Sequence, residues 1–164
     1  MKQRLLNTTL LLMAIVLWGC PYKSSVPLSE ATENVNKQML GRWVPQGMED
    51  KENPEYYLIE QRDTLHYDVA HYLYSDEGKE YSVKNYVGHT TRLENILFMN
   101  LQESGTKEYL IYRLDLSDGT MTKYEVTNNI DEQFNDSQKL REFVQKYMRL
   151  SFFYNADEVE LVRK

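Results

Sequence analysis

The middle of the chain alternates between apolar and polar residues with a period of two, the spacing of a β-strand that buries one face. Residues 109–116 show this most clearly, because Arg113 and Asp115 share one face and apolar residues share the other. The residues expected to face inward in this run are Leu110, Tyr112, Leu114 and Leu116. Residues 96–101 are apolar at nearly every position, which indicates a strand buried on both faces.

Turn residues separate these runs, and Ser117-Asp118-Gly119 is the clearest hairpin signal because Asp and Gly tolerate a positive φ. The runs therefore predict a meander of antiparallel strands. In residues 121–127, Tyr124 and Val126 are expected to point inward. The expected strands cover residues 42–44, 56–61, 65–74, 80–88, 96–101, 109–116, 121–127 and 159–163.

Two segments follow the helical period instead. Ser29 provides an N-cap for a short helix that stops at Gly41. Asp136 or Ser137 begins a second helix, which covers residues 137–149. The apolar face of this second helix comprises Leu140, Phe143, Val144, Tyr147 and Met148.

The order of these elements predicts a mainly β domain: a short helix, a meander of seven or eight strands, an amphipathic helix and a last strand. Such a meander closes most easily into a small barrel or a strongly curved sheet, because closure removes unpaired strand edges. The second helix is too large for the interior of such a barrel. We therefore expect it to cover an open end or one flank, and the last strand to close the sheet.

Gly41-Arg42-Trp43 stands at the start of the first strand, between the short helix and the meander. This motif and the order of elements over residues 29–163 resemble the lipocalin-like proteins, including small bacterial lipoproteins of uncharacterised function. The resemblance implies that Trp43 packs across the closed end of a barrel beneath an Arg from the last strands, for which Arg163 is the candidate by position. Alternatively, Trp43 is a core aromatic that follows the end of a helix.

The N-terminus carries a basic start, an apolar segment and then Leu17-Trp18-Gly19-Cys20. The apolar segment, Leu5 to Trp18, is too short to span a bilayer comfortably. The last four residues resemble the bacterial lipobox, which implies cleavage between Gly19 and Cys20 and attachment of diacylglycerol and a further acyl chain, such as palmitate, to Cys20. The alternative is an ordinary secretory signal or an uncleaved anchor in which the cysteine is coincidental.

These features predict a signal peptide at residues 1–19, a lipidated N-terminus and linker at residues 20–28, and a single lipocalin-like β-domain at residues 29–164. By resemblance to enteric sorting, Pro21 after Cys20 favours the outer membrane over the inner one. No acidic cluster follows Cys20, which favours a domain that faces the periplasm, although the cell surface stays open.

The composition narrows the classes of function. The chain has 25 acidic and 19 basic residues and a net charge of −6, which argues against a nucleic-acid partner. Its single cysteine is used by the expected anchor, which leaves none for a disulfide or a cysteine metal site.

Candidate chemistry is sparse. His66 and His71 point to opposite faces of one strand and cannot chelate one ion without a bulge, and His89 is the third histidine. No catalytic, phosphate-binding or metal-binding motif is present in the sequence. We therefore expect a protein that is not an enzyme and uses no cofactor or metal.

Thirteen tyrosines are the main excess in the composition. Tyr has an apolar ring and a polar tip, which suits a cavity for an amphipathic ligand, an exposed recognition surface or simply a half-buried strand. The candidate ligand-binding residues are Tyr67, Leu97, Met99, Leu110, Tyr112 and Tyr124.

Two functions remain open at this point. The first is a membrane-anchored binding module for a small hydrophobic or amphipathic ligand, which predicts a cavity inside the barrel. The second is a protein-interaction or protective lipoprotein, with a role in envelope assembly, inhibition or immunity. It predicts a filled interior and a contiguous exposed aromatic patch.

Overall fold

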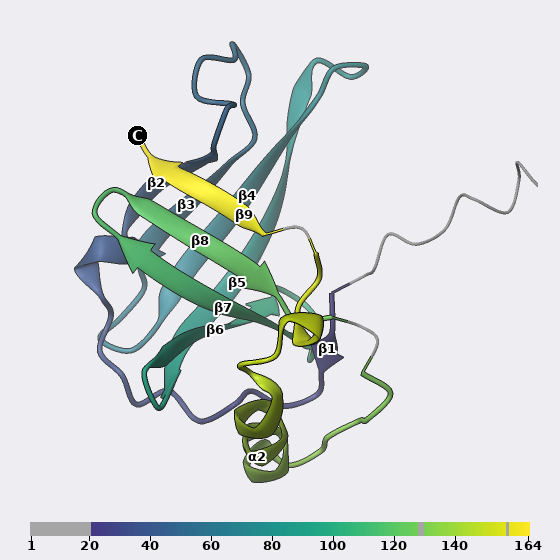
Figure 1. The fold of residues 1–164 in the computed structure, drawn as a ribbon. Coiled ribbons are helices and arrows are strands. Elements are labelled where there is room, and N and C mark those ends of the chain that lie inside the picture. Colours follow the sequence, from purple (N-terminus) through teal and green to yellow (C-terminus); the bar gives the residue numbers. More distant parts are fainter. Residues whose placement is uncertain (1–20, 128–129, 157) are drawn as a thin grey trace, which may run out of the picture.

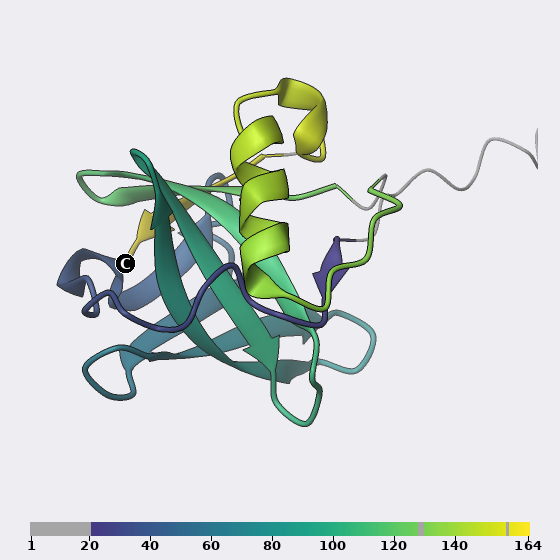
Figure 2. The same ribbon diagram turned by 90° about the horizontal axis from the view of Figure 1, so that it is seen from below.

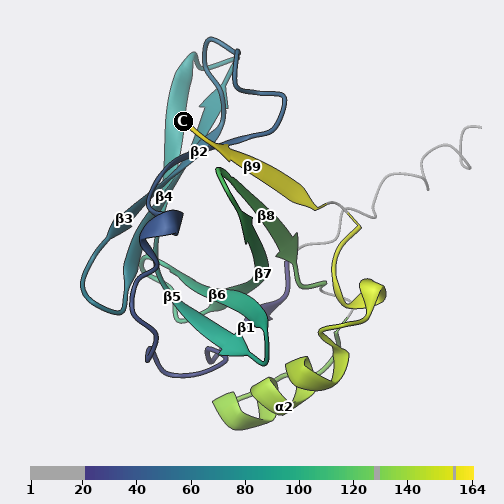
Figure 3. The same ribbon diagram turned by 60° about the vertical axis from the view of Figure 1, so that its left-hand side comes forward.

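The computed structural model describes residues 21–127, 130–156 and 158–164, and there the chain forms a closed antiparallel barrel (Figures 1 and 3). Strands β2 to β8 follow one another as a meander, and β9 closes the ring between β8 and β2. The barrel strands are β2 (Gly41–Pro45), β3 (Tyr56–Gln61), β4 (Tyr67–Ser75), β5 (Glu80–Leu93), β6 (Ile96–Glu103), β7 (Tyr109–Ser117), β8 (Thr120–Glu125) and β9 (Val159–Arg163). The expectation of a mainly β barrel closed by the last strand is confirmed, whereas the signal peptide, Gly19 and Cys20 lie outside the described residues.

Strand β5 is longer than the sequence predicts, because it continues past Gly88 to Leu93. Gly88 pairs with Leu101 across to β6, and a Cβ atom on Gly88 would lie 2.6 Å from Leu101 Cδ2. Glycine thus leaves room for the Leu101 side chain to cover the strand. The residue that suggests a strand end in the sequence is instead a point of close packing.

The segment expected as a linker is packed against the barrel. Within it, β1 (Lys23–Ser24) pairs with β7, and the backbone N–H of Tyr22 donates to the carbonyl of Val126 at 3.0 Å. Tyr22 and Leu28 are only 4% and 1% exposed. These residues therefore belong to the folded domain.

The short helix expected between Ser29 and Gly41 is reduced to a 3₁₀ turn, η2 (Lys37–Met39). The chain before it runs extended along the outside of the barrel (Figure 2). Buried polar groups on the outer face of β5 and β6 hold it there. Leu28 N–H donates to Asn100 Oδ1 at 2.8 Å, and His89 Nε2 donates to the carbonyl of Ser29 at 2.8 Å. These contacts with the barrel replace the intrahelical hydrogen bonds.

Helix α2 (Ser137–Tyr147) lies outside the ring of strands, as expected (Figure 3). The Asp136 side chain caps it by accepting from Lys139 N–H at 2.9 Å. Its buried residues Leu140 and Val144 pack in a cluster with Phe98 and other outer-face residues of the barrel. The described part of the chain thus has two apolar clusters, one inside the barrel and one between the barrel and α2. No helix in that part is long and apolar enough to cross a bilayer.

Candidate ligand-binding cavity

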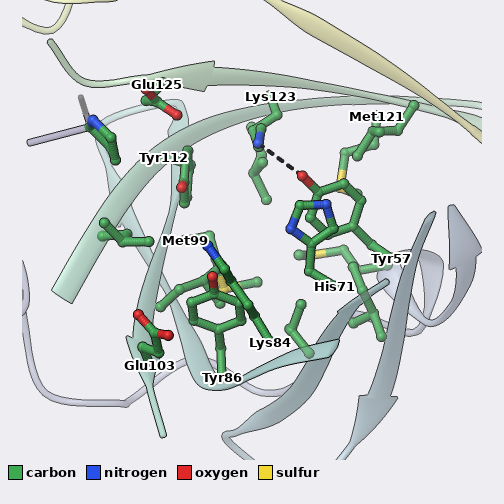
Figure 4. Close-up of a pocket in the computed structure, with 18 of the residues that line it drawn as sticks. Tyr57, His71, Lys84, Tyr86, Met99, Glu103, Tyr112, Met121, Lys123 and Glu125 are labelled. Atoms are coloured by element: carbon green, nitrogen blue, oxygen red, sulfur yellow. Dashed lines mark hydrogen bonds between the residues drawn. The ribbon is translucent and has the colours of Figure 1, made fainter. Parts of the chain in front are cut away.

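The barrel interior contains a cavity of about 340 Å³ (Figure 4). This volume lies within the range of about 300–1,000 Å³ that is typical of small-molecule sites. The apolar part of its wall includes Met39, Ile59, Met99, Leu114, Met121 and Leu161. The polar part includes Tyr57, His71, Tyr86, Tyr112 and Lys123.

The two ends of the barrel differ. At one end Met39 of η2 and Trp43 of β2 are 0% and 1% exposed, and Trp43 Nε1 donates to the carbonyl of Met39 at 2.8 Å. At the other end the cavity is lined by Lys23 and Lys84, which are exposed to solvent. The cavity is therefore closed by η2 and Trp43 and opens at the end where β1 joins the barrel.

Trp43 and Arg163 meet at the closed end. The two residues are paired across β2 and β9, and the Arg163 guanidinium carbon lies 4.9 Å from the centre of the Trp43 ring. The same guanidinium donates to the carbonyl of Gln38 in η2. Gly41 has a φ of +124°, which a residue with a side chain rarely adopts, so glycine is required where the chain leaves η2 and enters β2. The arrangement implied by the sequence resemblance is thus present.

Of the candidate ligand-binding residues, Met99, Leu110 and Tyr112 line the cavity. Tyr67 and Leu97 belong to the interior cluster but not to the cavity wall. Tyr67 is 0% exposed, and its hydroxyl accepts from Asn36 N–H at 2.6 Å, so it fastens the segment that leads into η2.

The inward orientation expected for Tyr124 is wrong. Its ring lies 5.9 Å from that of Tyr154 and 4.6 Å from the Arg113 guanidinium, on the outer side of the barrel. Lys123 and Glu125 line the cavity instead. The outer face of β8 is also covered by apolar groups, so an apolar residue there does not mark the interior.

Lys123 is one of the charged residues that line the cavity, and it points toward its tyrosines. Its Nζ donates to Tyr57 Oη at 3.3 Å, and it lies 4.7 Å from the centre of the Tyr112 ring (Figure 4). Burial lowers the pKa of this ammonium group. Among residues 21–127, 130–156 and 158–164, no carboxylate lies within ion-pair distance of it.

The nearest carboxylates have other partners. Glu125 Oε1 accepts from Asn155 Nδ2 at 2.7 Å, and Glu55 Oε1 lies 2.6 Å from His71 Nε2. The hydrogen bond from His71 is the main reason why the pKa of Glu55 is lowered. Glu125 and Glu55 therefore attract Lys123 over a longer distance, but neither forms an ion pair with it in the described part of the chain.

Burial raises the pKa of the two phenols beside Lys123, those of Tyr57 and Tyr112, above the ordinary value of 10, so both are protonated at neutral pH and well above it. The Tyr57 ring stacks on His71 with centroids 4.1 Å apart and an interplanar angle of 9°. This stacking and the His71–Glu55 contact hold the Tyr57 hydroxyl in place. Tyr57, His71 and Lys123 were not candidate ligand-binding residues, because nothing local in the sequence distinguishes them.

The three histidines do not form a common site, although the rings of His66 and His89 lie edge-on with centroids 6.1 Å apart. His66 contacts Asp63 at 2.9 Å, His71 contacts Glu55, and burial lowers the pKa of His89, which binds the carbonyl of Ser29. In the described ranges, no group of three or more His, Cys, Asp or Glu side chains is arranged to hold a metal ion.

A second group of tyrosines lies on the outer face of β3, β4 and β5. The rings of Tyr56 and Tyr72 stack with centroids 4.3 Å apart, and Tyr81 contacts both of them edge-on. Tyr74 lies against Tyr81, and the Arg42 guanidinium lies 4.1 Å above the Tyr56 ring. Three tyrosines thus line the cavity and four others form this outer cluster.

Comparison with known proteins found no matching family model, no matching curated protein and no matching solved structure. The function is therefore argued from the geometry of the barrel and of its cavity.

Proposed function

We propose that this protein is a non-catalytic binding module that holds a small hydrophobic or amphipathic ligand inside its barrel. The observation that carries the proposal is the interior cavity of about 340 Å³. Protein interiors are close-packed, so a cavity large enough for a small molecule is unusual in a barrel with a purely structural role. Its apolar wall suits a hydrocarbon group, and its tyrosines and Lys123 suit a polar head.

A protein-interaction or protective role is the second candidate, and the outer tyrosine cluster favours it. Tyr56, Tyr72, Tyr74 and Tyr81 form a contiguous aromatic surface of the kind found at protein interfaces. However, this function predicts a filled interior, and the cavity argues for ligand binding. A Tyr72→Ser variant separates the two candidates, because it alters the outer surface and leaves the cavity wall intact. It should weaken binding of a partner protein if the second function is correct, and it should leave small-molecule binding unchanged if the first is correct.

We also propose that the protein is anchored to the membrane through a lipid on Cys20, with the outer membrane and a periplasmic orientation favoured. Pro21 forms a bridge to Thr127, so the chain is packed against the barrel from the residue that follows the proposed anchor. Pro21 also lines the cavity. An anchor at Cys20 would therefore hold the open end of the barrel close to the lipid surface, with no flexible spacer between them.

The test is native mass spectrometry of the full protein, purified from its own cells in a non-ionic detergent. We expect a small molecule to co-purify with the protein. A Leu110→Trp variant fills the cavity near its opening and should lose that molecule, whereas Leu150→Trp on the outer surface should keep it. The proposal is refuted if no small molecule co-purifies and none binds from a total lipid extract of the same cells.

The anchor has a separate test. Radiolabelled palmitate should be incorporated into the wild-type protein and not into a Cys20→Ser variant. Labelling that persists in the variant would contradict the proposed anchor.

A further inference from the structure

We propose that the ligand is an amphipath with a singly charged anionic head group, such as a fatty carboxylate, and that Lys123 and Tyr57 bind that head. This inference rests on the proposed function and specifies the chemical class of the ligand. It starts from one feature of the cavity, the half-buried Lys123 ammonium group, which forms no ion pair within the described part of the chain.

A buried charge without a counterion is costly, because the interior solvates it poorly. The direct contacts of Lys123 are a phenol oxygen and two aromatic rings, and Glu125 and Glu55 attract it at longer range; together these offset part of that cost. The charged and titratable groups around it are Glu125 on its own strand, Glu55 before β3, His71 on β4 and the phenols of Tyr57, Tyr86 and Tyr112. Both carboxylates are held by other side chains, so an incoming anion would supply the missing partner.

Tyr57 provides the second contact. Its hydroxyl oxygen accepts from Lys123 Nζ, and the hydroxyl proton is free to be donated. A carboxylate placed against both groups would accept one hydrogen bond from the ammonium and one from the phenol. Charge-assisted hydrogen bonds of this kind are about twice as strong as neutral ones.

The wall beyond Lys123 suits a hydrocarbon tail. On β8, the next inward residue toward the closed end is Met121, and Met39, Met99, Leu114 and Leu161 complete an apolar surface. Methionine side chains are flexible and adapt to irregular apolar ligands. The head group therefore lies near Lys123, and the tail lies between it and Trp43.

Other head-group charges fit this site less well. A cationic head would meet Lys123 at close range, and like charges in a poorly solvated interior repel strongly. A neutral head would leave the ammonium uncompensated. A head with further negative charge would lie near Glu103 and Glu125, which line the same cavity.

The experiment compares octanoate, octanol and octylammonium, which share one tail and differ in head-group charge. The full protein is kept in digitonin, whose rigid steroid is too large for a cavity of about 340 Å³, and binding is measured by calorimetry near neutral pH. We expect octanoate to bind most tightly. Lys123→Met should weaken octanoate binding about tenfold to a hundredfold, and Tyr57→Phe by a smaller factor.

Two controls make the test specific. Lys139→Met makes the same substitution on the exposed face of α2 and should leave octanoate affinity unchanged. Isotope-edited NMR of methylated lysines should show that octanoate raises the pKa of Lys123 and that octanol does not, a signature that a purely structural role for Lys123 does not produce.

The possible failures are distinguishable. If none of the three compounds binds, and no cell-derived small molecule is found, both this inference and the proposed function fail. If octanol or octylammonium binds as tightly as octanoate, or if Lys123→Met leaves octanoate affinity unchanged, only the anionic head group is refuted and the binding function stands.

Discussion

At the scale of single residues, the charge of Lys123 and the ring of Trp43 define opposite parts of the barrel interior. Lys123 lies in the cavity beside two phenols, whereas Trp43 closes the far end beneath Arg163. In the described part of the chain, Lys123 forms no ion pair, whereas Trp43 is held by its hydrogen bond to Met39 and its contact with Arg163. Substitutions at the two positions should therefore change stability in opposite directions.

Lys123→Met should stabilise the empty protein by about 1 kcal/mol near neutral pH, because it removes a poorly solvated charge and keeps a similar volume. The pKa of Lys123 is lower in the folded protein than the value of 10.5 for a free lysine. The unfolded chain thus binds more protons between those two pKa values, and the stability of the wild-type protein rises with pH through that window. The difference in free energy of unfolding between the variant and the wild-type protein should therefore narrow as the pH rises.

Urea unfolding at several pH values, with ligand removed, measures this difference. A variant that is less stable than the wild type at every pH would show that Lys123 is already compensated in the empty barrel.

Arg163→Met should lower the free energy of unfolding by about 1 kcal/mol, because it removes the cation–π contact with Trp43 and the hydrogen bond to Gln38. Arg62→Met is the matched control, because Arg62 forms an exposed ion pair with Asp68 that should contribute little. Urea unfolding of both variants checks this prediction. Equal effects would contradict a special role for Arg163.

At the scale of elements, the segment between β1 and η2 shows that tertiary contacts override local helical periodicity. The backbone at Leu28 and Ser29 and the hydroxyl of Ser29 form hydrogen bonds with buried polar side chains of β5 and β6. Asn100 is the centre of this arrangement: it is 0% exposed, accepts from Leu28 N–H and donates to Thr91 Oγ1 at 2.9 Å. The segment is therefore a packed part of the domain and not a loose connection.

Asn100→Leu should lower the free energy of unfolding by about 2 kcal/mol, because it leaves the buried Leu28 N–H without an acceptor. It should also speed hydrogen exchange of the Leu28 amide, which NMR measures directly. Gln102→Leu, two residues along the same strand and more exposed, is the control and should change stability by less than about 1 kcal/mol. Unchanged exchange at Leu28 would contradict the assignment.

Tyr22→Ala tests whether the N-terminal segment belongs to the folded domain. Tyr22 is 4% exposed in the cluster between the barrel and α2, so truncation should cost about 3 kcal/mol. Glu30→Ala alters an exposed residue of the same segment and should have little effect. Thermal unfolding of both variants measures these effects. A negligible effect of Tyr22→Ala would show that residues 20–28 act as a linker rather than as part of the folded domain.

At the scale of the whole molecule, closure by β9 creates the interior. This strand pairs with β2 on one side and β8 on the other, and Leu161 at its centre lines the cavity. Without it, two neighbouring strands would present unpaired edges. The ligand site therefore depends on a strand that follows α2, far along the chain from most of the wall.

Deletion of residues 159–164 should abolish cooperative unfolding and promote aggregation, as seen by circular dichroism and size-exclusion chromatography. Deletion of Lys164 alone, which lies beyond β9, should preserve a folded protein with the elution volume and unfolding transition of the wild type. A folded, soluble protein that lacks β9 would show that the barrel does not need closure.

Much of the fold could be predicted because strand period and turn chemistry are local properties. Residues 56–61 and 159–163 were expected as strands and match β3 and β9, and Asp136 caps α2 as expected. The faces of β8 were assigned wrongly because α2 and its neighbours bury the outer surface, so both faces carry apolar residues. The sequence does not identify Tyr57, His71 and Lys123 as site residues, because nothing near them along the chain distinguishes them from other strand residues. They form a site only because the closed barrel brings them together.

The sequence by itself determined the order of strands and helices and the meander that favours closure, because alternation, turn residues and helix caps act over short distances along the chain. Only the tertiary structure decided which side of β8 faces inward, that the N-terminal segment binds the barrel, and that Lys123 meets Tyr57 without a carboxylate. The reason is that burial and charge compensation depend on residues far apart in the chain, such as Tyr57 and Lys123, which come into contact only when the barrel closes.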